Sequence, residues 1–144
     1  MAETPQDAGS VSKVSCVAQV RDRGEARVAL FRHLAPLTVD ALVHALPSDS
    51  RVNVGPAMVS LFTTIQVGVE KSKKAFERGD VAFLANGSLL CVFLKGVKSD
   101  RPLNPVGKVE SGMELFNSIR PGDVVRLIPA PAQAEQTSQD PAQT

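Results

Sequence analysis

The sequence predicts a mainly β fold, a small closed antiparallel barrel of about eight short strands with two short helices. The first observation is the stretch Gly79–Leu94, in which two apolar runs flank Asn86-Gly87, a strong hairpin signal because both residues tolerate a positive φ. The second is that both runs are apolar at odd and even positions alike, so we expect both hairpin faces to be covered, with a packed interior and helices outside. The third is a series of short strands with few long connections, which favours a barrel or a sandwich over βαβ units.

Length and composition fit a single globular domain. The chain has 144 residues, 43% of them hydrophobic, and its aromatic residues are six Phe with no Trp or Tyr. We expect a core of aliphatic side chains in a domain spanning residues 13–128. Residues 1–12 and 129–144 are polar or rich in Pro, Ala, Gln and Ser, which predicts disordered tails.

Charge and hydropathy restrict the partners and the compartment. The net charge of +1 comes from 16 basic and 15 acidic side chains, so no nucleic acid or anionic membrane is expected as a partner. The N-terminus lacks the apolar region of a signal peptide, and no apolar run has the length of a membrane span. The sequence therefore predicts a soluble cytoplasmic protein, and it leaves the oligomeric state open.

The first half of the domain is expected to hold strands around one helix. Strands are predicted at 13–20, 25–32, 51–54 and 58–65, the first two as a hairpin, with a loop at 48–50. A helix is predicted over Pro36–Leu46, because proline suits a first turn and apolar residues recur at helical spacing. Its exposed side carries Asp40 and His44 as an i, i+4 pair. The stretch 66–78 contains bases interleaved with acids, so it is either a solvated loop or a small basic patch.

The second half follows the central hairpin. We expect a polar loop at 95–104, a short strand at 105–109, a brief helix and a last strand at 123–128. Ser111 and Glu114 have the spacing of a capping box at the start of that helix, with Leu115, Phe116 and Ile119 as its buried face. Cys16 and Cys91 lie in apolar runs, which predicts buried, reduced cysteines; a disulfide between them is the alternative.

The motifs of several common chemistries are absent. The sequence has no Gly-rich phosphate loop, C-x-x-C, H-E-x-x-H or G-x-S-x-G motif. His33 and His44, the two histidines, have no cluster of Cys or carboxylates near both. No metal and no cofactor is therefore expected.

Three segments together resemble the cyclophilin superfamily. Residues 28–46, V-A-L-F followed by A-P-L-T-V, resemble the family's E-L-F-x-x-x-A-P-x-T-V strand and helix. Residues 79–93 resemble its strand pair ending in N-G-S-x-F-F, and residues 106–114, V-G-K-V-E-S-G-M-E, resemble F-G-K-V-x-x-G-M. The chain looks most like the small, shortened cyclophilin-like proteins of prokaryotes, which form a family of unknown function. The resemblance implies an eight-stranded antiparallel barrel closed by two helices.

The resemblance also implies a candidate site for peptidyl-prolyl isomerisation. Arg51 in Arg51-Val52 is similar to the family's H-R-V arginine, which withdraws the prolyl nitrogen from conjugation, and Met58 is similar to its methionine. Ser60 stands where the family has glutamine. Ala57 and Cys91 fall near its two pocket phenylalanines, and Leu103 falls near its histidine. The groove wall is reduced to the turn that contains Ala85 and Asn86.

Two functions follow as hypotheses. One is a weak prolyl isomerase or proline-peptide binder with Arg51 as the catalytic residue and a groove lined by Met58, Ser60, Ala85, Asn86, Cys91 and Leu103. The other is a non-enzymatic barrel that binds a small ligand or a protein partner in the same groove.

Overall fold

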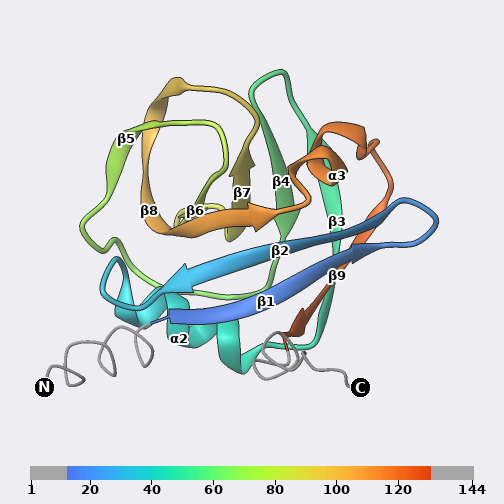
Figure 1. Cartoon of the computed structure of the whole chain (residues 1–144). Coiled ribbons are helices and arrows are strands. Elements are labelled where there is room, and N and C mark those ends of the chain that lie inside the picture. The colour runs from blue at the N-terminus through green and yellow to red at the C-terminus, as the bar shows by residue number, and fades with distance from the viewer. Residues whose placement is uncertain (1–12, 131–144) are drawn as a thin grey trace, which may run out of the picture.

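A computed structural model describes residues 13–130, which form strands with two intervening helices (Figure 1). The elements in chain order are β1 (Lys13–Val20), β2 (Gly24–Phe31), α2 (Pro36–His44), β3 (Ser48–Val54), β4 (Met58–Phe62), β5 (Lys73–Phe76), β6 (Asp80–Leu84), β7 (Leu89–Phe93), β8 (Val97–Ser111), α3 (Met113–Ser118) and β9 (Val124–Pro129).

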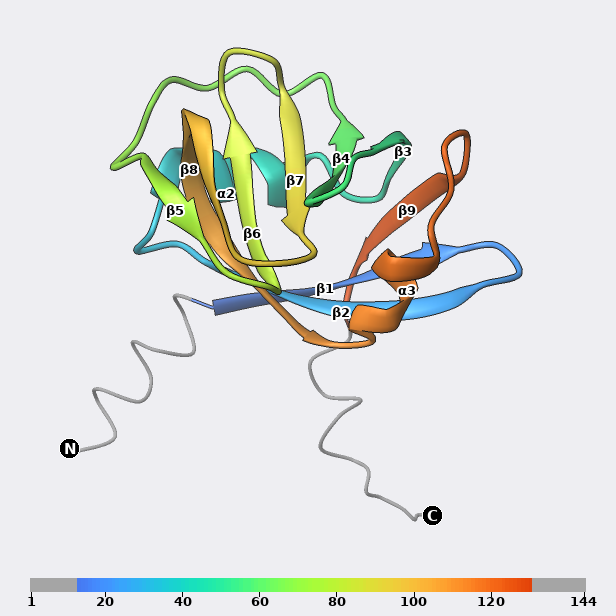
Figure 2. The same ribbon diagram turned by 90° about the horizontal axis from the view of Figure 1, so that it is seen from above.

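The strands form a closed antiparallel barrel, as predicted. Hydrogen-bonded neighbours follow the order β2-β1-β9-β3-β4-β7-β6-β8, and β8 pairs again with β2, which closes a ring of eight strands. The ninth strand, β5, lies outside the ring and pairs with β8. The long strand β8 therefore meets three partners: β5 through its first half, and β6 and β2 through its second (Figure 2).

The central hairpin is confirmed, but its turn differs from the prediction. Leu84 pairs with Leu89, so the loop has the four residues Ala85–Ser88 and not two. The Gly87 N–H donates to the Leu84 carbonyl at 3.2 Å. The positive φ falls on Ser88, at 55°, and not on Asn86 or Gly87.

The barrel interior is filled by alternate residues of the strands and by both helices. Val81 and Phe83 of β6 and Leu90 and Val92 of β7 belong to this interior cluster. The helices, which lie at separate ends of the barrel (Figures 1 and 2), add Val39, Leu42, Leu115, Phe116 and Ile119. The prediction that helices cover the outside of β6 and β7 is therefore wrong. This face is covered by β5 and the first half of β8, whose Phe76 and Leu103 pack there.

Several polar segments predicted as loops are strands. Residues 48–50 start β3 because they pair with β9, and the predicted loops at 66–78 and 95–104 contain β5 and the first half of β8, which pair with each other. These strands lack an apolar alternation that would reveal them, and their pairing partner is distant in sequence. Other boundaries differ by a few residues: β4 ends at Phe62, α2 ends at His44 and β9 reaches Pro129. The rest of the predicted tails, 1–12 and 131–144, lies outside the described residues.

The predicted capping box of the second helix is wrong. Ser111 is the last residue of β8 and pairs with Arg27 of β2. Gly112 takes the N-cap position with φ 78°, and no side chain caps the helix. The predicted buried face of Leu115, Phe116 and Ile119 is confirmed.

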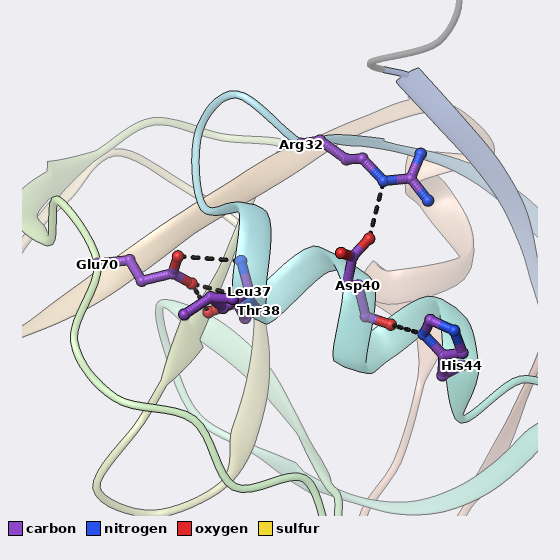
Figure 3. Close-up of polar contacts among 6 residues, drawn as sticks. All are labelled: Arg32, Leu37, Thr38, Asp40, His44 and Glu70. Atoms are coloured by element: carbon purple, nitrogen blue, oxygen red, sulfur yellow. Dashed lines mark hydrogen bonds and ion pairs between the residues drawn. The ribbon is translucent and has the colours of Figure 1, made fainter.

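Helix α2 is capped by a side chain from a distant loop (Figure 3). Its N-cap residue Ala35 has no side-chain acceptor. Instead, the Glu70 carboxylate accepts from the backbone N–H of Leu37 at 3.0 Å, and from the N–H and hydroxyl of Thr38 at 2.7 and 2.6 Å. Burial opposes ionisation of Glu70, but these hydrogen bonds outweigh it and lower the pKa of the carboxyl group.

Asn104 joins the same loop to β8. Its side chain is 1% exposed; it accepts from the Glu70 N–H at 2.8 Å and donates to the Thr38 hydroxyl at 3.1 Å and the Gly68 carbonyl at 2.9 Å. Buried amides need such partners, and here they hold the loop before β5 against α2.

The predicted Asp40–His44 side-chain pair does not form. The Asp40 carboxylate accepts from Arg32 Nε at 2.9 Å, and His44 Nδ1 lies 2.8 Å from the Asp40 backbone carbonyl (Figure 3). The hydrogen bond between Arg32 and Asp40 joins two charged groups, and such charge-assisted hydrogen bonds are strong.

Candidate functional site

A second apolar cluster covers the outer face of β6 and β7. It consists of Phe76, Ala82, Cys91, Phe93 and Leu103, all buried. The rings of Phe76 and Phe93 stack with centroids 4.5 Å apart and an interplanar angle of 7°. Successive residues of a strand face opposite sides of the sheet. Alternate side chains of β6 and β7 therefore pack in the barrel interior, and the side chains between them pack in this outer cluster.

A pocket of about 380 Å³ opens into this cluster. Buried apolar side chains form its floor, and exposed polar side chains of β8 form part of its rim. The lining residues are Ala57, Met58, Leu84, Leu89, Cys91, Phe93, Val97, Lys98, Ser99, Asp100, Arg101 and Leu103. An apolar floor with a few polar groups at the edge is the usual composition of a ligand site.

The polar rim is made by an irregularity in β8. Pairing with β5 shifts from Lys73↔Leu103 to Ala75↔Lys98, so Ser99–Pro102 have no register partner on β5. Bulges of this kind bend a strand and redirect its side chains. Here Ser99, Asp100 and Arg101 reach the pocket.

The structure brings together three of the residues singled out from the sequence. Met58, Cys91 and Leu103 all line the pocket, as does Ala57. Ser60 lies behind the floor: it is buried, is the register partner of Cys91, and places its Oγ 3.7 Å from the Cys91 Sγ. The substrate-binding roles of these residues stay a prediction.

The remaining predicted residues do not line this pocket. Ala85 and Asn86 lie in the β6–β7 turn, and the lining residues there are Leu84 and Leu89 on either side. Arg51 is exposed on β3, where its register partner is Val124 of β9, whereas Asn53 is the residue paired with Ser60. The catalytic role of Arg51 stays a prediction, and the arginine that does line the pocket is Arg101.

Sequence reasoning missed Phe93 and the rim residues 97–101. Phe93 could have been found, because it has the same strand parity as Cys91 and so shares its face. The rim residues gave no such signal, since V-K-S-D-R has the composition of a surface loop.

The cysteines are buried and neither forms a disulfide, as predicted. Burial raises the pKa of Cys16 to about 11 and also raises the pKa of Cys91, against a smaller opposing effect of the hydrogen bond with Ser60. Cys91 is therefore protonated at neutral pH and forms an apolar part of the pocket floor. A nucleophilic thiol would instead require a lowered pKa.

Another concavity, of about 630 Å³, lies over β1, β2, β3 and β9. Its lining includes Glu25, Asp49, Arg21 and Arg126, with 3.5 Å between Arg126 Nη1 and Asp49 Oδ1. Val20 is the single buried apolar residue in this lining, which favours the pocket on β7 and β8, with its apolar floor, as the ligand site.

Residues 13–130 contain no group of three or more His, Cys, Asp or Glu that could hold a metal ion. Over the same range, neither helix has the length and apolar character needed to span a membrane.

The family model described as cyclophilin-like matches residues 15–128. The chain belongs to the cyclophilin-like family. Among solved structures, this cyclophilin-like chain is similar to the hypothetical protein AF2241 from Archaeoglobus fulgidus, with 26% identity, a TM-score of 0.72, and 83% of this chain and 96% of that chain covered. No curated protein sequence matches the chain.

More distant structures share the fold alone. McbB, solved in complex with tryptophan, has 15% identity and a TM-score of 0.68, with 81% of this chain and 45% of McbB covered. A cyclophilin-type peptidyl-prolyl cis-trans isomerase from Cryptosporidium parvum has 11% identity and a TM-score of 0.57, with 82% of this chain and 98% of that chain covered.

Proposed function

We propose that this cyclophilin-like protein is a binding protein that takes an apolar group of a small ligand or of a proline-containing peptide into the pocket between β4, β7 and β8. The observation that carries the proposal is that Met58, Cys91 and Leu103, singled out by their resemblance to the cyclophilin groove, line one cavity of about 380 Å³. That volume lies within the roughly 300–1,000 Å³ of typical ligand sites.

The pocket supplies affinity mainly through its apolar floor. Phe93 and Leu103 are almost completely buried, and Phe93 stacks on Phe76, so the base of the pocket needs little side-chain ordering on binding. The apolar surface open to a ligand is that of the half-buried Met58, Leu84, Leu89 and Val97. Each methylene group that a ligand buries there contributes about 0.8 kcal/mol.

Binding without catalysis fits the position of the arginines. Rotating an X-Pro bond means lowering a barrier of about 18–20 kcal/mol, which requires a donor held at the prolyl nitrogen in a dry groove. Arg51 is exposed and is not among the pocket's lining residues. We therefore favour the binding hypothesis over the isomerase hypothesis for this site.

The proposal can be tested by NMR with an acetylated, amidated Ala-Ala-Pro-Leu peptide. We expect shift changes at Val97, Leu103 and their neighbours, and cis/trans exchange of the peptide at its uncatalysed rate of tens of seconds. Met58→Ala should weaken binding about fivefold to tenfold because it removes an apolar wall. Met113→Ala, the same change in α3, is the control and should leave the affinity unchanged.

Two results would change the conclusion. Accelerated exchange that disappears in Arg51→Ala would establish the isomerase instead. The absence of any shift at the pocket residues at millimolar peptide, together with no effect of Met58→Ala, would exclude this pocket as the binding site.

A further inference from the structure

Positive charge is concentrated in the segment of the chain that contains β5 and the start of β8. Residues 71–101 carry seven basic side chains against three acidic ones, a net charge of +4, in a chain whose total is +1. The basic residues are Lys71, Lys73, Lys74, Arg78, Lys95, Lys98 and Arg101, and the acidic ones are Glu77, Asp80 and Asp100. The sequence alone left the stretch 66–78 as either a solvated loop or a basic patch.

The pairing of β5 with β8 joins the two basic segments. Ala75 pairs with Lys98 and Lys73 with Leu103, a residue of the pocket floor. Lys73 Nζ lies 5.2 Å from the ring centroid of Phe76, and that ring stacks on Phe93 in the floor. Lys73 of β5 is therefore adjacent to the apolar site.

Two cations lie on the rim itself. Lys98 and Arg101 line the pocket and are exposed, with Asp100 as the single acid among the lining residues. Of the other acids, Asp80 accepts the Glu77 backbone N–H at 2.8 Å. A carboxylate held at the rim could thus meet an ammonium and a guanidinium group, and arginine binds carboxylates in a two-pronged geometry.

We propose that the pocket's ligand is an apolar group that bears a carboxylate, with the apolar part against the half-buried Met58, Leu84 and Val97 and the carboxylate paired with Lys98 and Arg101. This inference rests on the proposed binding function and specifies the ligand class. A free small carboxylic acid and the C-terminal residue of a peptide share this chemistry. The surrounding positive potential would also attract such a ligand before contact.

The test compares each acid with its neutral amide in calorimetric and NMR titrations of the full chain at low salt. The probes are acetyl-Ala-Pro-Leu and acetyl-leucine, each as the free acid and as the amide. We expect the acid to bind about tenfold tighter than the amide, because its charge-assisted hydrogen bonds are lost in the amide. The difference should shrink as salt is raised from 50 to 500 mM, since salt screens exposed charges.

Charge-matched variants show whether the preference for the acid over the amide depends on Lys98 and Arg101. Lys98→Gln with Arg101→Gln should reduce the acid-to-amide ratio to less than twofold. Lys108→Gln with Arg120→Gln removes the same charge from exposed residues that lie outside the basic segment and do not line the pocket, and it should keep most of the ratio. All four positions are exposed, and circular dichroism would verify that each variant is folded.

The outcomes separate the two proposals. If acid and amide bind the pocket equally, the carboxylate proposal is overturned and the binding function stands. If neither acid nor amide shifts the pocket resonances, both are overturned. If acids bind preferentially, acetyl-leucine as tight as the tripeptide supports a free acid as the ligand, and a clear advantage of the tripeptide supports a peptide C-terminus.

Discussion

The barrel closes where β8 approaches β2 closely, at a glycine. Gly107 of β8 is the register partner of both Leu30 on β2 and Val81 on β6. A Cβ atom at this position would lie 1.8 Å from the Ala29 carbonyl oxygen. Glycine is required here by the close approach of two backbones and not by an unusual φ.

Gly107→Ala should therefore destabilise the protein by about 3 kcal/mol or more, since backbone cannot yield as a flexible side chain can. Urea unfolding followed by circular dichroism measures the change. Gly96→Ala is the matched control, because its Cβ would make an ordinary contact of 3.7 Å with the Phe76 carbonyl. Equal stability of the two variants would contradict the closure argument.

Small residues also shape the pocket. Ala57 and Cys91 line it at positions where the resemblance to cyclophilins places phenylalanines. Their small volume leaves space beside Phe93, while burial keeps the Cys91 thiol protonated. The polar side chains at the edge of the same pocket, Lys98–Arg101, come from β8.

At the scale of elements, helix α2 depends on a loop that is far away in the sequence. The Glu70 carboxylate accepts from the first free N–H groups of the helix, 33 residues from Leu37. A negative charge there satisfies backbone donors and complements the helix dipole.

Glu70→Gln should cost about 1 kcal/mol of stability at pH 7, as the loss of a helix cap does. The hydrogen bonds lower the Glu70 pKa below its usual value of 4.5, so the carboxylate's contribution is fully present above that value. It is lost as the pH falls through the lower pKa of the folded state. The difference between wild type and variant in urea unfolding should thus disappear in acid.

Glu77→Gln provides the comparison for this prediction, since Glu77 is exposed and its contact in the described structure is made by its backbone N–H. It should change stability by less than about 0.5 kcal/mol at either pH. A pH-independent cost of Glu70→Gln would show that packing, and not the charge, is what matters.

At the scale of the whole molecule, the chain builds two apolar clusters on one sheet. The interior cluster is enclosed by the ring of eight strands, and the outer cluster lies under β5 and the first half of β8. Since β5 pairs with β8 alone, we expect β5 and the first half of β8, which forms one side of the pocket, to open without opening the barrel.

Phe76→Ala should therefore raise amide hydrogen exchange in β5 and in residues 97–103 while β1, β2 and β9 stay protected. Its ring packs on Phe93 in the outer cluster. Phe83→Ala, which removes a fully buried interior ring, should instead cost about 3–5 kcal/mol and raise exchange throughout. A uniform rise in both variants would show that the two clusters unfold together.

Patterns that are local in sequence determined much of the fold. The β1–β2 hairpin, the β6–β7 hairpin, the start of α2 at Pro36 and the buried face of α3 could all be predicted, because strand alternation, helical spacing and turn residues act over a few positions. The resemblance of three short segments to cyclophilins supplied the closed ring, and through it Met58, Cys91 and Leu103 at the pocket.

Only the tertiary structure decided the rest. Polar stretches such as 73–76 and 97–103 became strands because each offered the other a partner, and backbone pairing leaves no hydropathy pattern in the sequence. The bulge that carries Arg101 to the rim, and the Glu70 side chain that caps α2, depend on contacts between distant residues. The aliphatic core could thus be predicted from local sequence patterns. The polar rim of the pocket could not, because it depends on the pairing of β5 with β8, which are far apart in the sequence.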